Sequence, residues 1–190
     1  MPRVSQAHLD SRRQQIVDAA RARFASHGFA HTSMADIVAE SGLSNGAIYR
    51  YFTSKDEIVV AVCEQGTDAL PRALSAEAVG GFLEYVRTQA RDTHHARLVA
   101  QIYAEAAVSP LLAAVVQRQL SAMRAAIAEL VPDRQRPRAG QIAEAFVALC
   151  VSYSLQLAVR GDVDPAPYAA GLMAIINDPG DHEVIASTRR

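Results

Sequence analysis

The sequence predicts an all-α protein, in which a small N-terminal unit of three helices is joined to a larger helical bundle. Three observations over the 190 residues support this fold class. Apolar residues recur every three or four positions in most segments. No segment shows the sustained alternation of apolar and polar residues that a half-buried strand needs. Serine, glycine and proline stand between the periodic segments, where helices begin and end.

Serine N-caps and glycine stops define the helices of the N-terminal unit. Three of the serines are followed three residues later by Gln, Asp or Glu, which is the spacing of a capping box. Gly28 and Gly42 suit the left-handed position that ends a helix. The predicted helices open at Ser11 (partner Gln14), Ser33 (partner Asp36), Ser44, and Ser54 (partner Glu57).

Longer amphipathic segments follow Pro71 and predict the bundle. Pro110 and Pro165 lie where a first helical turn tolerates proline, and Gly161 ends the longest segment. The polar stretch 132–137, which holds two prolines and two arginines, is predicted to be a loop. The predicted helices cover residues 79–92, 98–106, 110–130, 138–160 and 165–176.

Composition narrows the class of protein. Half of the residues are apolar, so the chain can build a core. Two cysteines give no disulfide framework, the first ten residues lack the apolar stretch of a signal peptide, and no apolar run is expected to cross a membrane. These features predict a cytoplasmic protein. The net charge of −1 does not by itself indicate a nucleic-acid partner.

Two short helices, 33–41 and 44–51, joined by a turn with Gly42, have the arrangement of a helix-turn-helix. In this motif the second helix enters the major groove of DNA. Ile37, Leu43, Ile48 and Phe52 have the spacing needed to lock the two helices together.

The remaining residues of the second helix are predicted to face outward and to contact DNA. Small side chains let the backbone approach the bases, and tyrosine hydroxyls can donate to phosphates. An asparagine can pair with adenine, and an arginine with guanine or a phosphate. Lys55, the only lysine, is expected near the start of the next helix, where an anion is favoured. The predicted DNA-binding residues are Ser33, Ser44, Asn45, Gly46, Ala47, Tyr49, Arg50, Tyr51 and Lys55.

The order Gly42-Leu-Ser, Ile48-Tyr, Tyr51-Phe and Ser54-Lys-Asp-Glu, preceded by Ile16-Val-Asp-Ala-Ala, resembles the DNA-binding domain of the TetR family over residues 11–62. The resemblance implies that Tyr49, Tyr51 and Lys55 contact phosphates and that residues 45–47 lie against bases. Asn45 and Ala47 depart from residues common in the family, and Ala35 stands where some members have a base-reading arginine. These departures imply a different operator.

The resemblance also implies a division into a helix-turn-helix domain (1–53) and a helical regulatory and dimerisation domain (54–190). It implies a homodimer built through the last two helices, a palindromic DNA operator, and a repressor released by a small-molecule effector, with no other cofactor. Helix 138–160, apolar nearly all round, agrees with a cavity on one side and a partner on the other. Candidate cavity residues are Tyr103, Gln119, Met123, Tyr153 and Gln156, for each of which ordinary packing is the alternative.

Other functions are less consistent with the sequence. A helical enzyme would need a catalytic motif, and no Gly-rich phosphate loop, HExxH, CxxC or nucleophile elbow occurs. A protein-interaction adaptor leaves the outward tyrosines unexplained. No metal site is expected, since His94 and His95 are adjacent and point about 100° apart on a helix, as surface histidines. Cys63 and Cys150 are interpreted as core residues, with a redox role as the alternative.

Overall fold

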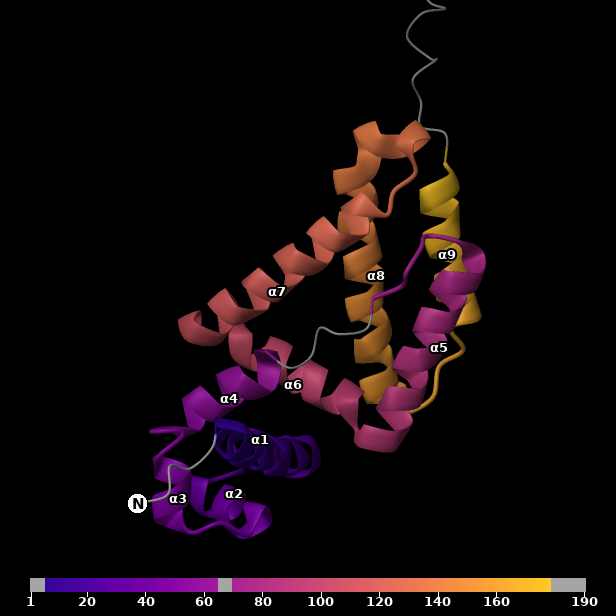
Figure 1. Ribbon diagram of the computed structural model, residues 1–190. Coiled ribbons are helices and arrows are strands. Elements are labelled where there is room, and N and C mark those ends of the chain that lie inside the picture. The colour runs from indigo at the N-terminus through magenta and orange to yellow at the C-terminus, as the bar shows by residue number, and fades with distance from the viewer. Residues whose placement is uncertain (1–5, 65–69, 179–190) are drawn as a thin grey trace, which may run out of the picture.

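A computed structural model describes residues 6–64 and 70–178 of the protein, and every regular element in that part of the chain is helical (Figure 1). The all-α prediction is therefore confirmed. The elements are α1 (Gln6–His27), α2 (Met34–Ser41), α3 (Asn45–Tyr49), α4 (Lys55–Glu64), α5 (Ala76–Thr93), α6 (His95–Ala106), α7 (Pro110–Glu129), the 3-10 helix η1 (Asp133–Arg138), α8 (Ala139–Arg160) and α9 (Ala166–Asn177).

Helices α1 to α3 form a small unit, the head, at one end of the molecule, and α4 leads from it into the body, α5 to α9 (Figure 1). The head follows the predicted caps. The Ser33 side chain and Asp36 form a complete capping box at the start of α2, and Gly42 adopts φ 67° at its end. The turn between α2 and α3 therefore has the geometry that the sequence predicted.

One hydrophobic core, the head core, joins the head to the body. Ile16, Phe24, Ile37 and Ile48 are buried in it together with residues of α4. The same cluster contains Leu98 of α6 and, from α7, Leu112 and Val115. Helices α6 and α7 therefore share one continuous core with the helices of the head.

A second cluster, the body core, lies between α5, α8 and α9 and the end of α7. Phe146 and Ile142 of α8 are fully enclosed there with Leu83 and Leu172. At the far end of α5, Arg87 Nε lies 2.6 Å from Asp162 Oδ1, and this ion pair ties α5 to the connection between α8 and α9. The body is thus built around α8, as its apolar sequence predicted.

Two local predictions were wrong, and a third was half right. Ser11 does not begin a helix, since α1 already includes Gln6. At the start of α4 the Ser54 hydroxyl accepts from the backbone N–H of Glu57 at 3.3 Å, as predicted, but the Glu57 carboxylate accepts from the N–H and the hydroxyl of Thr53, so only half of the capping box forms. The segment 132–137 is largely the 3-10 helix η1, stabilised by a backbone bond from Gln135 to Pro132.

The segment Asp133–Arg160, which contains α8, is long and apolar enough, by length and composition alone, to cross a membrane. The expectation that no segment would reach this length was therefore wrong. In the structure α8 packs against α5, α6, α7 and α9. A central core helix and a membrane span share this composition, and 39% of the most apolar 18-residue stretch is buried in the structure.

Candidate nucleic-acid interface and cavity

Helix α3 is short and is held in place from both ends. Ser44 caps it, its hydroxyl oxygen accepting from the backbone N–H of Ala47 at 3.3 Å. Ile48 is fully buried in the head core. The chain then turns back through a bond from the N–H of Tyr51 to the carbonyl of Ile48 at 2.9 Å. A helix of five residues keeps its shape here because tertiary contacts fix it.

The outer side of α3 is open to solvent. Asn45, Gly46 and Arg50 are exposed, and half of the Tyr49 surface is accessible. A Cβ placed on Gly46 would meet no atom within 4 Å, so packing within the chain does not require glycine there. A glycine costs helix stability, and a close approach by a partner backbone is one reason to keep it.

Two of the predicted residues are partly turned inward. Tyr51 is half-buried and packs against the head core, and Ala47 is also half-buried. Tyr51 therefore contributes to packing as well as to the surface beside α3. Its hydroxyl contact with DNA stays a prediction.

Ser33 and Lys55 make interactions inside the chain. The hydroxyl and the backbone N–H of Ser33 both donate to Asp36 Oδ2, at 2.6 and 2.8 Å. These two bonds hold the pKa of Asp36 below its usual range. Lys55 Nζ donates to the carbonyl of Phe29 at 2.8 Å. The N-terminus of α2 thus already faces a carboxylate, while the ammonium of Lys55 keeps further N–H groups for an anion.

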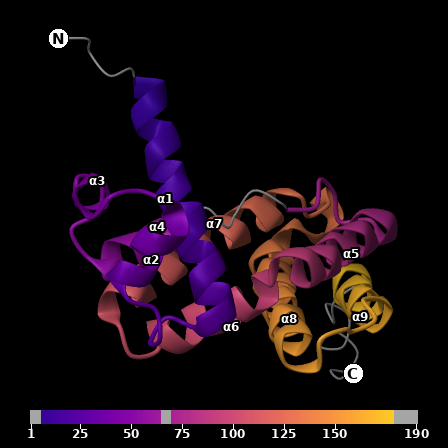
Figure 2. The ribbon, with the colours of Figure 1, turned by 90° about the horizontal axis from the view of Figure 1, so that it is seen from below.

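The N-terminal turns of α1 add residues that the sequence analysis missed. His8 and Arg12 line a shallow groove together with Ser44, Arg50 and Tyr51. In Figure 2 the start of α1 projects beyond the body, on the same side of the molecule as α3. The signal was present in the sequence as two basic residues four apart, but the helix was predicted to start after the first of them.

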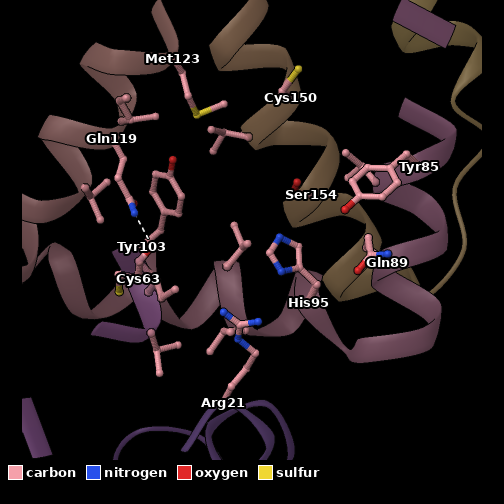
Figure 3. A pocket seen from close by; sticks show the side chains of 18 of the residues that line it. Arg21, Cys63, Tyr85, Gln89, His95, Tyr103, Gln119, Met123, Cys150 and Ser154 are labelled. Carbon is pink, nitrogen blue, oxygen red and sulfur yellow. Dashed lines mark hydrogen bonds between the residues drawn. The ribbon is translucent and has the colours of Figure 1, made fainter. Parts of the chain in front are cut away.

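Between the head and the body lies a cavity of about 350 Å³, lined by residues of α1, α4, α5, α6, α7 and α8. Of the predicted cavity residues, Tyr103, Gln119 and Met123 lie on its wall (Figure 3). The Gln119 amide donates to the backbone carbonyl of Cys63, which fixes the wall between α7 and α4.

Tyr153 and Gln156 are not among the lining residues, so their assignment is corrected. Tyr153 is buried in the body core, and its hydroxyl donates to the carbonyl of Val163 at 2.9 Å. Gln156 is half-buried on α8. The position of a residue along α8 decides which side of the helix it occupies, and both lie away from the cavity side.

Several polar residues of the cavity were not expected from the sequence. They come from four helices and meet only in the folded chain: Arg21, Tyr85, Gln89, His95 and Ser154. His94 takes φ 54° and separates α5 from α6, which leaves it exposed and carries His95 onto the cavity wall. The prediction that both histidines lie on the surface was therefore wrong for His95.

Both cysteines are buried and line the same cavity. Burial raises the pKa of Cys63 to about 11 and that of Cys150 to about 12. Over the described ranges 6–64 and 70–178, no group of three or more His, Cys, Asp or Glu residues is placed to hold a metal ion.

A profile of the family described as "Bacterial regulatory proteins, tetR family" matches residues 16–62, from the middle of α1 through most of α4. The chain is 40% identical over 77 residues to the HTH-type transcriptional regulator YfiR of Bacillus subtilis, covering 40% of this chain and 38% of that protein. It spans 38% to 44% of the length of the first three curated relatives it matches.

A longer match exists to an HTH-type transcriptional repressor of Mycobacterium tuberculosis, 33% identical over 145 residues and covering 76% of this chain and 70% of the relative. The fold is similar to that of GusR from Salmonella enterica, with a TM-score of 0.73 and 20% identity over 94% of this chain and 98% of the other. The two curated relatives are named as a regulator and a repressor of transcription. The chain belongs to the TetR family of bacterial regulatory proteins.

Proposed function

We propose that this protein is a ligand-responsive transcriptional repressor that binds a palindromic DNA operator as a homodimer and is released by a small-molecule effector. The observation that carries the proposal is α3, which exposes Asn45, Gly46, Tyr49 and Arg50 to solvent on the well-packed head. One α-helix fits the width of the major groove, and these side chains suit bases and phosphates. The proposal places the protein in the cytoplasm, with its DNA.

The outer faces of α8 and α9 support a dimer through the last two helices. Along α8 the exposed positions Ala148, Ser152 and Val159 follow one another at helical spacing, and Val159 is 85% exposed. On α9, Ala170 and Ala174 are exposed one turn apart. Small and apolar residues at this spacing let two copies of the helix pair pack closely as a four-helix bundle.

The cavity supports an effector of small size. Its volume of about 350 Å³ lies within the range of ligand pockets, and its walls are mostly apolar with a few polar groups. Proteins of similar fold have been solved with small molecules: a regulator from Saccharomonospora viridis with choline, at TM-score 0.67, and the multidrug binding protein EbrR with imidazole, at TM-score 0.68. A ligand in this cavity touches α6 and α7, which also contribute to the head core.

The mechanism that we propose is a shift between two arrangements of the dimer. DNA binding needs the two α3 helices about one helical turn of DNA, or about 34 Å, apart. A ligand that fits better when α6 and α7 hold the heads at another spacing favours the state that does not bind DNA.

A gel-shift assay with the DNA directly upstream of the protein's own coding region tests the proposal. We expect a specific complex that competitor DNA of random sequence does not remove and that weakens steeply as salt rises, because phosphate contacts release counterions. An enzyme or an interaction adaptor would give no specific complex. Random DNA competing as well as the upstream fragment would overturn the proposal.

A further inference from the structure

The cavity carries two basic side chains that come from different parts of the chain. Arg21 belongs to α1 of the head, and His95 is the first residue of α6. In Figure 3 the Arg21 side chain extends from α1 into the cavity, below the imidazole of His95. Burial and the nearby charge of Arg21 both lower the pKa of His95, so the imidazole is a neutral N–H donor at neutral pH beside a permanent cation.

The rest of the lining is neutral. None of the nineteen described residues that line the cavity is an aspartate or a glutamate. Tyr85, Gln89 and Ser154 place hydroxyl and amide groups on the same side as His95 (Figure 3). On the opposite side, Met123 lies together with the hydroxyl of Tyr103 and the amide of Gln119, which donates to the carbonyl of Cys63 (Figure 3). The cavity therefore has its cationic group on one side and an uncharged, partly apolar wall on the other.

We propose that the effector is an amphipathic small acid, whose carboxylate lies between Arg21 and His95 and whose apolar stem packs against α6 and α7. This inference rests on the proposed function, since it assigns a ligand class to the cavity. A guanidinium holds a carboxylate through paired, charge-assisted hydrogen bonds, which are stronger than bonds between neutral groups. A cationic ligand would bring like charges together at the same point.

The position of Arg21 also gives the ligand a direct link to the head. Arg21 lies on the helix that carries the fully buried head-core residues Ile16 and Phe24. A carboxylate bound by Arg21 and His95 joins α1 to α6 without any intermediate side chain. The anionic group thus contributes to holding the head in one orientation, whereas a neutral ligand of the same shape only fills the cavity.

Matched probes test the ligand class on the free protein. Hexanoate, octanoate and 4-phenylbutanoate are compared by calorimetry with the alcohol and the amine of the same carbon skeleton. We expect at least one carboxylate to bind about tenfold or more tightly than its alcohol, because a charge-assisted bond replaces a neutral one, and we expect the amines to bind most weakly. If no carboxylate binds more tightly than its alcohol, the proposal is overturned.

Variants test the residue. Arg21→Gln should reduce the preference for carboxylate over alcohol to within about twofold, and Arg21→Lys should restore part of it. Arg118→Gln, which removes the same charge from a side chain on α7 that is 65% exposed and outside the cavity, should leave the preference unchanged. Melting curves identify any variant that is misfolded. An unchanged preference in folded Arg21→Gln would overturn the role of this residue.

The test of the ligand class and the test of DNA binding can fail independently. Calorimetry uses no DNA, so a protein that binds its upstream DNA but prefers the alcohol or the amine disproves the ligand class and leaves the repressor intact. A protein that prefers the carboxylate but gives no specific DNA complex disproves the repressor and leaves the assignment of the cavity.

Discussion

Lys55 Nζ donates a hydrogen bond of 2.8 Å to the carbonyl oxygen of Phe29. The bond joins the first turn of α4 to the turn between α1 and α2, so it fixes the head against the helix that leads to the body. The only lysine of the chain therefore has a structural partner at the edge of the proposed DNA surface.

The first prediction separates the two roles of Lys55. Lys55→Met should lower the free energy of unfolding by about 1 kcal/mol, since a half-buried bond to a carbonyl is lost. If the ammonium also binds a phosphate, the slope of log K for DNA binding against log salt concentration should become less steep by about one. Urea unfolding and DNA titrations at several salt concentrations measure both. An unchanged salt dependence would leave Lys55 with the structural role alone.

Gly46 provides a second prediction. Gly46→Ala should stabilise the protein by about 0.5–1 kcal/mol, because alanine favours a helix and space for its Cβ is open. The same change should weaken DNA binding if a DNA backbone or base approaches α3 closely. Gly140→Ala, also in open space on α8, is the matched control. Equal DNA affinity of the two variants would show that α3 does not approach DNA at this point.

Contacts with bases and contacts with phosphates should be separable. Tyr49→Phe removes one hydroxyl from an exposed side chain and should weaken binding to every DNA sequence, by roughly tenfold at most. Asn45→Ala should instead change the preferred sequence. Binding measured on a library of operator variants distinguishes the two effects. The assignment fails if both variants lose affinity uniformly.

The dimer surface is tested at an exposed valine. Val159→Glu places a charge on the proposed α8–α9 interface, where the native side chain is 85% exposed in the single chain. We expect a stable monomer with much weaker operator binding, because a buried unpaired charge opposes association. Val108→Glu, at a site 77% exposed between α6 and α7, is the control and should remain a dimer. Sedimentation velocity measures the state; a dimeric Val159→Glu would place the interface elsewhere.

The cysteines should be unreactive in the folded protein. With pKa values of about 11 and about 12, less than roughly one thiol in a thousand is ionised at pH 7.5, and the thiolate is the reactive form. Labelling by Ellman's reagent should therefore be slow and should become fast in denaturant. Rapid labelling of the folded protein would revive the redox alternative.

The head was predictable because its signals are local. Ser33, Asp36 and Gly42 determine α2 and its end through neighbours a few residues away, and the structure has the predicted capping box and left-handed glycine. The start of α1 was missed because Ser11, with Gln14 three residues later, has the spacing of a capping box although it lies inside the helix. At α4 the Ser54 half of the predicted box forms, but the Glu57 carboxylate binds Thr53, since a side chain at the start of a helix can reach more than one N-terminal donor.

The cavity was less predictable because it depends on which helices meet. Arg21 and His95 are far apart in sequence and come together only when α1 packs on α6. Tyr153 and Tyr103 are the same residue type and both were predicted to line the cavity. The Tyr153 hydroxyl instead donates to the carbonyl of Val163, inside the body core. The spacing of apolar residues along α8 predicts which residues face inward. It does not predict whether such a residue lines a cavity or packs in a core.

Hydroxyl-radical footprinting on the DNA upstream of the coding region tests the central claim most directly. If two copies of the protein each place α3 in a major groove, two protected patches should appear about one helical turn, or about 34 Å, apart, with the sequence between them related by two-fold symmetry. A single patch, or protection spread evenly along the fragment, would contradict the account.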